Sequence, residues 1–418
     1  MNICVFILMK KTILYFSDCP FFGGSENMLV NFFCSTNLKQ FYNLILLYPK
    51  NEVYQLEMEK RICSENTLSI ALLRHIDKID FVRSKVAIIK KIQYFFWAFI
   101  MVISRYPIII INILRFYKQF KNIDFDILHI NNGGYPAAIS CYSAVIASRL
   151  TGHKHIVYVI NNIPVGYTNI LRWLDWPLDR YIGKVVSRFI TGSENAGKYA
   201  EKVLKISRKR TTIHNGIVDR PIVIQKDKLK KEIGLSGGLT VFSTVANLED
   251  RKGHIYLFHA IKELVDKNMF TNAVFLIIGD GICKAELESY IKCNNLEKYI
   301  LMLGAKRNIF DFYNILDVFV LPSIGFEDFP NSILECMKLG VPTIASSIGG
   351  IPEQIVNGKT GIMVDAKNVE QLKDAILKLL NEKELRHSMA EKCVVRYNAK
   401  FTVTLSLQNY IKLYDELY

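Results

Sequence analysis

The stretch VFVLPSIGFEDFPNSILECMKLGVPTIAS, residues 318–346, contains an apolar run, a short loop, a helical segment and a second apolar run. The runs at 318–323 and 341–346 have the length and composition of buried strands. Between them, Pro330 suits the first turn of a helix and Gly340 suits its end. A strand, a helix and a further strand form the unit from which parallel sheets are built, so this stretch predicts an α/β fold.

Apolar runs separated by helical segments recur along the whole chain. In the first half they lie at 11–16, 44–49, 126–131, 155–160 and 188–193. In the second half they lie at 240–247, 273–281, 299–304, 318–323, 341–346 and 361–365. The pattern restarts at a lysine-rich joint that includes QKDKLKKEIGLSGG, and 418 residues are too many for one ordinary core. We therefore predict an α/β protein of two Rossmann-like, doubly wound domains, 1–215 and 216–399.

The charge and the cysteines limit the classes of function. The net charge of +14 indicates an anionic partner such as a nucleotide, a phosphate or a membrane surface. More than half of this excess lies in 74–121, which holds ten Lys or Arg residues and two Asp. The nine cysteines form no C-x-x-C pair, which argues against zinc ribbons and is typical of a reducing cytoplasm. The opening MNICVFILMK lacks the basic segment and cleavage site of a signal peptide, so we expect a cytoplasmic protein.

Residues 86–120 interrupt the alternation with a long, very apolar stretch. Arg105 and Pro107 divide it into two halves of about a dozen residues each, whereas a membrane-spanning helix needs about 20. Two alternatives stay open besides a true membrane span. The halves are either two core helices under the sheet, or two helices that enter the membrane interface, with Tyr94 and Trp97 at the level of the lipid head groups. The second alternative predicts a peripheral membrane contact through this stretch.

Two acids flank the start of the helix in the opening stretch. Glu327 lies in the loop after a strand, at the edge of the sheet where α/β proteins bind ligands. The helix that begins near Pro330 directs its free N–H groups toward the same place, which favours a phosphate. Glu335 lies about 7 Å further along the helix axis, where a carboxylate can accept hydrogen bonds from the hydroxyls of a ribose. The alternative is a loop acid and an ordinary acid on the helix surface.

The segment EDFPNSILE, followed by CMKLGVPTIASSIGGIPEQIVNGKTG, resembles the signature of glycosyltransferase family 4, which comprises retaining enzymes of the GT-B fold. Other family landmarks match in the same order: GGSE at 23–26, HNGI at 214–217, DRKGH at 250–254 and GDG at 279–281. The resemblance covers nearly the whole chain. It implies that 1–215 binds the acceptor, that 216–399 binds a nucleotide sugar, and that a C-terminal helix at about 400–418 packs back on the first domain.

The resemblance implies transfer of a sugar from a UDP- or GDP-sugar to a glycan acceptor, with retention of configuration and with no required cofactor or metal. The residues expected to act in catalysis are Glu327, Lys252 and Arg251. Those expected to bind the donor are Glu335, Asn331, Ser332, Phe329, Asn247, Gly279, Asp280 and Gly281. Those expected to face the acceptor or the cleft are Gly23, Gly24, Glu26, His129, Asn131, Asn161 and Asn215.

These roles have a physical basis in the residues themselves. Lys252 and Arg251 offer positive charge to a diphosphate, which gains negative charge as the sugar leaves. Glu327 can hold hydroxyls of the donor sugar. In the family an arginine usually precedes the lysine by five positions, but Asn247 stands there, which leaves open whether Arg251 supplies the second cation. His129 is as easily a core histidine as a ligand-facing one.

Several alternatives to this function follow from the same residues. A GT-B protein of another reaction type, such as a nucleotide-sugar epimerase, needs a set of groups for proton abstraction. A non-catalytic sugar-nucleotide binder would tolerate the neutral amides Asn131, Asn161 and Asn247. The lack of a G-x-G-x-x-G after the first strand argues against a nicotinamide dehydrogenase. The basic run at 207–210 lacks interleaved aromatic residues, so we expect no nucleic-acid partner, and the D-x-D at 124–126 precedes a strand and is interpreted as a capping turn.

The basic, apolar stretch in the acceptor half suggests a lipid-linked glycan as acceptor, at the inner face of the plasma membrane. The expected setting is bacterial surface polysaccharide synthesis, whether of capsule, O-antigen of lipopolysaccharide, or exopolysaccharide.

Overall fold

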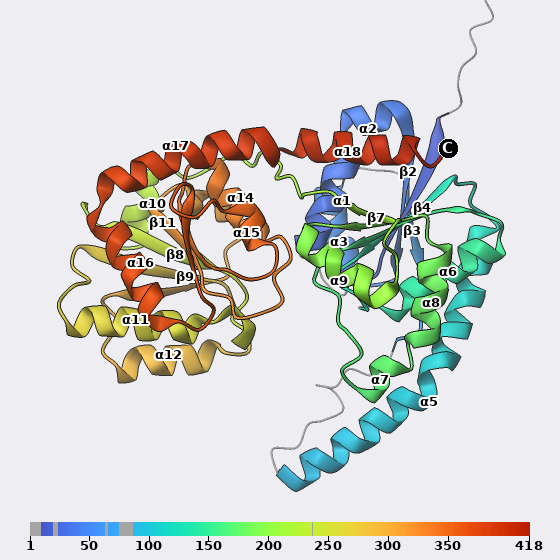
Figure 1. Ribbon diagram of the computed structural model, residues 1–418, viewed down its shortest axis with the longest axis horizontal. Coiled ribbons are helices and arrows are strands. Elements are labelled where there is room, and N and C mark those ends of the chain that lie inside the picture. Colours follow the sequence, from blue (N-terminus) through green and yellow to red (C-terminus); the bar gives the residue numbers. More distant parts are fainter. Residues whose placement is uncertain (1–9, 20–23, 63–65, 75–86, 137, 236) are drawn as a thin grey trace, which may run out of the picture. The chain divides into compact units, whose positions relative to one another are not determined.

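The computed structural model describes residues 10–19, 24–62, 66–74, 87–136, 138–235 and 237–418. The chain forms two compact units, each built on one parallel sheet (Figure 1). The first unit comprises Met1–Gly192, Ala196–Ile213 and Asn409–Tyr418, and the second comprises Ser193–Asn195 and His214–Gln408.

The sheet of the first unit has seven parallel strands in the order β3-β2-β1-β4-β5-β6-β7. The strands are β1 (Lys11–Ser17), β2 (Tyr42–Pro49), β3 (Thr67–Ile70), β4 (Ile127–Asn132), β5 (His155–Ile160), β6 (Arg188–Thr191) and β7 (Arg210–Thr212). The helices are α1 (Gly24–Cys34), α2 (Thr36–Phe41), α3 (Glu52–Arg61), α5 (Ala87–Phe120), α6 (Ile139–Leu150), α7 (Ile170–Trp173), α8 (Trp176–Val185) and α9 (Glu194–Leu204). The strand order reverses between β1 and β4, which makes their carboxyl ends the expected ligand edge.

The sheet of the second unit has six parallel strands in the order β10-β9-β8-β11-β12-β13. They are β8 (Thr240–Val245), β9 (Ala273–Ile278), β10 (Ile300–Gly304), β11 (Val318–Leu321), β12 (Thr343–Ser346) and β13 (Gly361–Val364). The helices are α10 (Lys226–Glu232), η1 (Asp250–Lys252), α11 (His254–Asp266), α12 (Lys284–Cys293), α13 (Ile309–Tyr313), α14 (Asn331–Lys338), α15 (Ile351–Gln354), α16 (Val369–Asn381), α17 (Lys383–Lys400) and α18 (Val403–Asp415), whose end belongs to the first unit. Here the order reverses between β8 and β11.

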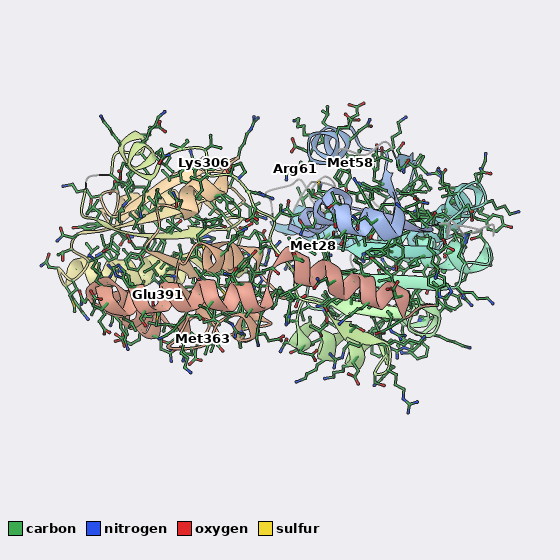
Figure 2. All side chains as sticks on the ribbon, turned by 90° about the horizontal axis from the view of Figure 1, so that it is seen from above. Met28, Met58, Arg61, Lys306, Met363 and Glu391 are labelled. Atoms are coloured by element: carbon green, nitrogen blue, oxygen red, sulfur yellow. The ribbon has the colours of Figure 1, made fainter. Side chains whose placement is uncertain are left out.

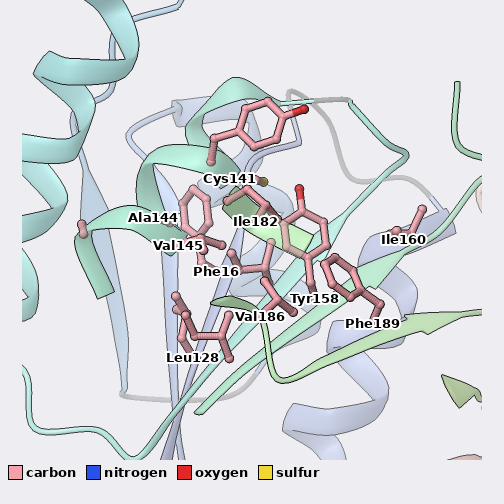
Figure 3. Close-up of a cluster of buried hydrophobic side chains, with 14 of the residues drawn as sticks. Phe16, Leu128, Cys141, Ala144, Val145, Tyr158, Ile160, Ile182, Val186 and Phe189 are labelled. Carbon is pink, nitrogen blue, oxygen red and sulfur yellow. The ribbon is translucent and has the colours of Figure 1, made fainter. Parts of the chain in front are cut away.

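The cores explain why these strands read as apolar runs. Strands covered by helices on both faces are apolar along their whole length, and β9 is buried at every position. In the first unit Phe16, Leu128 and Tyr158 of three neighbouring strands meet Val145 of α6 and Ile182 of α8 (Figure 3). On α1 and α3, Met28 and Met58 are likewise buried, and side chains fill the space between sheet and helices in each unit (Figure 2).

The stretch 86–120 does not form two helices as its sequence suggested. From Ala87 to Phe120 it is one helix of 34 residues with Pro107 in its interior. A proline removes one backbone hydrogen bond and usually bends a helix, but the turn just before it is fixed from the side. There the guanidinium of Arg105 is buried against the carboxylate of Asp175, the residue that precedes α8. Within the described residues, Lys91–Phe120 is long and apolar enough to span a membrane by length and composition, although only 17% of its most apolar window is buried.

His129 lies in the core of the first unit, which corrects the expectation that it faces the acceptor. Its ring is completely buried in β4, and its Nδ1 lies 2.7 Å from the hydroxyl of Tyr414 in α18. The rings of Tyr15 and Phe32 pack against it. Every position of β4 is buried, so both faces of the strand are covered and neither is open to a ligand. Burial lowers the pKa of His129 to about 3, because a charged imidazolium would lose its hydration there.

This buried histidine should make the first unit sensitive to mild acid. Its folded pKa lies below the ordinary value, so its contribution to stability is present above about pH 6.5 and is lost as the pH falls toward the folded value. Between about pH 6.5 and pH 5 we expect the free energy of unfolding to fall by up to about 2 kcal/mol. His129→Phe should remove that part of the pH dependence in urea unfolding. The exposed His387 offers the matched control, since His387→Phe should leave it unchanged; equal pH dependence in wild type and His129→Phe would contradict this account.

Candidate functional site

The loops that follow β8 and β11 form one edge of the second unit, where the strand order reverses. The loop after β8 carries Asn247, Arg251 and Lys252, and the loop after β11 carries Ser323 and Glu327. Ligands of open α/β sheets bind beyond the carboxyl ends of strands at such a reversal. The structure therefore brings together three of the residues expected to act in catalysis.

One oxygen of Glu327 collects the polar groups of this edge. The ammonium of Lys252 binds Glu327 Oε1, the hydroxyl of Ser323 donates to the same oxygen at 2.7 Å, and Arg251 Nη1 lies 3.6 Å from it. Glu327 and Ser323 are buried. Two cations thus face one carboxylate, and an anionic ligand would have to take the place of that carboxylate beside them. The sequence did not single out Ser323, although it directly follows a strand and Pro322.

Glu249 holds the two other polar side chains of the loop after β8. It accepts from Arg251 Nε at 3.0 Å and from Asn247 Nδ2 at 3.1 Å. Burial alone would raise the pKa of Glu249, but the hydrogen bond from Asn247 and the charge of Arg251 lower it overall. Asn247, which stands where the family has an arginine, therefore orients a carboxylate that in turn orients Arg251. Glu249 was not predicted from the sequence.

Gly253 explains how Lys252 reaches this position. It ends the short η1 helix in the left-handed region with a φ of 68°, and a Cβ there would lie 2.1 Å from the carbonyl oxygen of Pro322. Only glycine permits so close an approach of two backbones. The backbone N–H of Ile324 donates to the carbonyl of Arg251 at 2.8 Å and joins the two loops. The Lys-Gly pair therefore presses the cation-bearing turn against the loop of Glu327.

The glycines of GDG serve a similar packing role beside this edge. A Cβ on Gly279 would lie 1.9 Å from the carbonyl oxygen of Ala246, and one on Gly281 would lie 2.5 Å from that of Leu248. The side chain of Asp280 accepts from the backbone N–H of Gly281 at 2.8 Å and is largely exposed. The loop after β9 is thus held against the loop after β8. Its role in binding the donor base stays a prediction.

The amino end of α14 lies beside the turn that contains Asn215. The Asn215 Nδ2 atom donates to Asn331 Oδ1 at 3.1 Å, and the buried Phe329 stacks on the ring of His214 with centroids 4.6 Å apart. Pro330 precedes the helix without a side-chain cap, and Ser332 is partly buried in its first turn. Asn215 belongs by its contacts to the second unit rather than to a first domain that ends at 215.

Glu335 is not an ordinary acid on a helix surface. Glu335 is 9% exposed, and Tyr313 of α13 lies beside it. Burial raises the pKa of Glu335, while Tyr313 and the charge of Arg220 oppose that rise. Sequence reasoning missed Tyr313. A carboxylate that is nearly covered by protein has room for few further hydrogen bonds, which suits recognition of a single pair of hydroxyls.

The predicted residues of the first unit lie at the start of α1 and at the ends of β4 and β5. Gly23 lies outside the described residues, and Gly24 begins α1. Glu26 is buried and accepts from the Ser17 hydroxyl at the end of β1, at 2.6 Å. At the ends of β4 and β5, Asn161 Nδ2 donates to Asn131 Oδ1 at 2.8 Å.

A buried ionic cluster, which was not predicted from the sequence, contacts the loops that follow β4 and β5. Arg105 of α5 and Arg172 of α7 both contact Asp175, with Arg105 Nε at 2.7 Å and Arg172 Nη1 at 3.2 Å. Arg172 also contacts Asp179 at 2.7 Å. Asp179 in addition accepts hydrogen bonds from three tyrosine hydroxyls, namely those of Tyr135, Tyr142 and Tyr167. Because Tyr135 and Tyr167 belong to the two loops, the cluster fixes both of them.

In the part of the chain that the structure describes, no group of three or more His, Cys, Asp or Glu side chains is arranged to hold a metal ion. The expectation that no metal is required stays a prediction.

Comparison with known proteins shows what the chain resembles. The family model described as Glycosyl transferases group 1 matches residues 225–393, and the model described as Glycosyltransferase Family 4 matches residues 81–220. A UDP-Gal:alpha-D-GlcNAc-diphosphoundecaprenol alpha-1,3-galactosyltransferase of Escherichia coli is 26% identical over 317 residues, which are 73% of this chain and 79% of that protein. An N-acetyl-alpha-D-glucosaminyl L-malate synthase of Bacillus anthracis is 26% identical over 303 residues, which are 70% of this chain and 75% of that protein.

Solved structures show the likeness of fold. The Anabaena protein Alr3699/HepE, in complex with UDP, has a TM-score of 0.74 at 16% identity, over 97% of this chain and 100% of that one. A glycosyltransferase from Rickettsia africae ESF-5 has a TM-score of 0.75 at 19% identity, over 98% of this chain and 99% of that one.

Proposed function

The chain belongs to glycosyltransferase family 4 and is a glycosyltransferase of the GT-B fold, and on this premise we propose that it transfers a sugar, with retention of configuration, from a nucleotide-diphosphate donor to a lipid-linked glycan. The observation that carries the proposal is the convergence of Lys252, Arg251 and Ser323 on Glu327 at the strand reversal of the second unit. Few arrangements suit a sugar diphosphate better than cations beside a carboxylate, because one end of the ligand is anionic and the other carries hydroxyls.

In this proposal the two cations stabilise the leaving group. As the bond to the sugar breaks, negative charge accumulates on the diphosphate, and preorganised donors at that place lower the barrier. Lys252 and Arg251 supply the charge, and the N–H groups at the start of α14, near Asn331 and Ser332, supply further donors. Glu327 releases Lys252 when the donor arrives and accepts hydrogen bonds from the sugar hydroxyls. Glu335 holds the ribose.

The proton of the acceptor does not need a strong protein base. His129 is buried in the core, and Asn131 and Asn161 are neutral amides paired with each other. In this proposal an oxygen of the donor phosphate takes the proton, which is consistent with retention of configuration. These amides would instead hold hydroxyls of the acceptor at the ends of β4 and β5.

The names of the relatives suggest the substrates to test first. The Escherichia coli relative is named for UDP-galactose and for an acceptor linked to diphosphoundecaprenol, and the Anabaena protein was solved with UDP. We therefore propose a UDP-sugar as donor and a polyprenyl-diphosphate glycan as acceptor. The setting would be the synthesis of a surface polysaccharide at the cytoplasmic face of the membrane, with peripheral contact through 86–120.

A panel of UDP- and GDP-sugars tests this function. The protein should release free nucleoside diphosphate from one of them, and an acceptor that carries a polyprenyl diphosphate should raise the rate and yield a product with one more sugar. A protein that binds the nucleotide but releases none in the presence of any acceptor would be a non-catalytic binder. An altered sugar still attached to its nucleotide would indicate an epimerase.

Glu335→Gln should weaken the binding of UDP. A hydrogen bond to a charged group contributes about 1.5–3 kcal/mol, so we expect the dissociation constant to rise about tenfold or more. Calorimetric titration with UDP measures it directly. Glu391 is exposed on α17 and gives the matched control Glu391→Gln, which should bind as the wild type does. An unchanged UDP affinity in Glu335→Gln would exclude the ribose contact but not the transfer of sugar.

A further inference from the structure

The first half of α5 is apolar on every side and yet exposed. Residues 92–104 read IQYFFWAFIMVIS, in which Gln93 and Ser104 are the polar ends. Phe95, Phe99 and Ile103 follow each other at one-turn spacing and are 69%, 54% and 58% exposed. A helix that is hydrophobic all round is normally buried. Figure 1 shows this half extending away from the sheet of its own unit.

The second half of α5 is held against the first unit along one stripe. The stripe comprises Arg105, Ile109, Asn112, Phe116 and Phe120, all of which are buried. The opposite face stays apolar and exposed, at Ile110 and Leu114. The exposed apolar surface therefore continues from the first half of α5, Ala87–Ser104, onto the second half, Arg105–Phe120.

Short helices beside α5 extend this surface with aromatic side chains. The hydroxyl of Tyr106 donates to the carbonyl of Leu174, between α7 and α8, at 2.6 Å. Ile170, Trp173 and Trp176 of these helices are exposed. Tryptophan and tyrosine are enriched where a protein meets the boundary between lipid head groups and hydrocarbon.

The charges around the surface indicate its occupant. The sequence of α5 contains no Asp or Glu, Lys91 is exposed near its start, and Lys118 and Lys121 are exposed at its end. An apolar surface with aromatic residues and a cationic border complements an anionic bilayer, in which each basic residue near the surface adds to the attraction. The surface of a second copy of this chain would carry the same positive charges and would repel it.

The first half of α5 is too short to cross the membrane while the second half stays packed against the first unit. Ala87–Ser104 extends about 27 Å, less than the roughly 30 Å of a hydrocarbon core. The charged Arg105 follows directly and is paired with Asp175 inside the first unit. A helix anchored in this way enters one leaflet or lies along it.

We propose that the first half of α5, Ala87–Ser104, inserts into the cytoplasmic leaflet of an anionic membrane, with Trp173 and Trp176 at the head-group level. This inference rests on the membrane contact of the proposed function and deepens it, because it names the part of the chain that inserts; it does not depend on the reaction. The buried cluster gives it a consequence for the acceptor. Arg105 of the inserted helix binds Asp175, and through Arg172 and Asp179 it is joined to the loops after β4 and β5. The inserted helix thereby holds those loops near the surface where a lipid-linked glycan lies.

The three tryptophans of the chain permit a direct test. In the variant Trp173→Phe/Trp176→Phe, Trp97 is the sole tryptophan. With vesicles of phosphatidylglycerol and phosphatidylethanolamine, we expect its emission to shift to the blue and to fall by about half or more when the acyl chains are brominated. Vesicles of phosphatidylcholine should bind about tenfold more weakly at low salt. Binding without quenching by brominated chains would overturn the insertion.

Two aspartates in the first half of α5 should abolish the binding to vesicles. Phe99→Asp/Ile103→Asp should lower the vesicle partition coefficient about a hundredfold or more. The matched control, Val223→Asp/Val395→Asp, alters exposed apolar residues of the second unit and should bind as the wild type does. Both variants should keep the wild-type release of nucleoside diphosphate, so that failure here is separable from failure of the transferase proposal. If the wild type ignores vesicles and sediments as a dimer that the first pair dissociates, the surface is a protein interface and the proposal is wrong.

Discussion

Lys252→Ala is expected to lower the rate of nucleoside diphosphate release about a hundredfold or more. Its ammonium is the partly buried cation that contacts Glu327, and removal of one preorganised charge beside a developing anion typically costs two to three orders of magnitude. The effect should appear in kcat, since the charge on the leaving group grows between the bound donor and the transition state. Steady-state release of UDP, with the preferred donor at saturation, measures it.

The fold should survive this change, because Ser323 and Arg251 remain beside the carboxylate of Glu327. Lys262 of α11 provides a matched control. It forms an ordinary helix-surface pair with Asp266, and Lys262→Ala should leave kcat unchanged. Lys252→Arg should recover part of the rate, since the charge is kept and the geometry is not. Wild-type kcat in Lys252→Ala would remove this lysine from the mechanism.

Asp179→Ala should lower the free energy of unfolding of the first unit by about 3–5 kcal/mol. The carboxylate is completely buried and neutralises Arg172. Its loss leaves a buried cation with half of its partners and three tyrosine hydroxyls without their acceptor, and the removal of one partner of a buried pair costs about this much. Tyr135 and Tyr167 would also be released, so the loops after β4 and β5 should exchange their amide hydrogens faster.

Urea unfolding followed by circular dichroism measures the loss. Asp266→Ala removes an aspartate of the same kind from an exposed pair and should cost less than about 1 kcal/mol. Asp179→Asn should fall between the two, because an amide oxygen still accepts from the tyrosines. A loss below about 1 kcal/mol for Asp179→Ala would show that the cluster does not hold these loops.

The fold was largely predictable because the strands are buried on both faces. Such strands are continuous apolar runs, and each central strand of both sheets was anticipated within three residues. The strands β3 (Thr67–Ile70) and β7 (Arg210–Thr212) were missed. Both are short edge strands with neighbours on one side only, so their sequences, TLSI and RTT, carry little apolar signal. The single helix α5 was missed because the buried partner of Arg105 lies 70 residues away in the sequence.

The site was predictable where local spacing determines it. Lys252, Arg251 and Glu327 meet because each follows a strand at the reversal of one sheet. Side chains supplied by other elements, such as Tyr313 beside Glu335, could not be predicted from the sequence around the residue they contact. His129 could not be assigned either way, since a histidine in a strand reads the same whether its side chain meets a ligand or the rings of α18.

If Lys252 binds the diphosphate as proposed, its contact with Glu327 makes that carboxylate a competitor of the ligand. Inorganic phosphate would have to compete with this carboxylate for the ammonium of Lys252. A sugar nucleotide would instead bring hydroxyls that donate hydrogen bonds to the displaced carboxylate. In the proposed mechanism, that carboxylate would compete again for Lys252 after the transfer and would weaken the binding of the nucleotide product. The same side chain would thus favour loading of the complete donor and hasten clearance of its remnant.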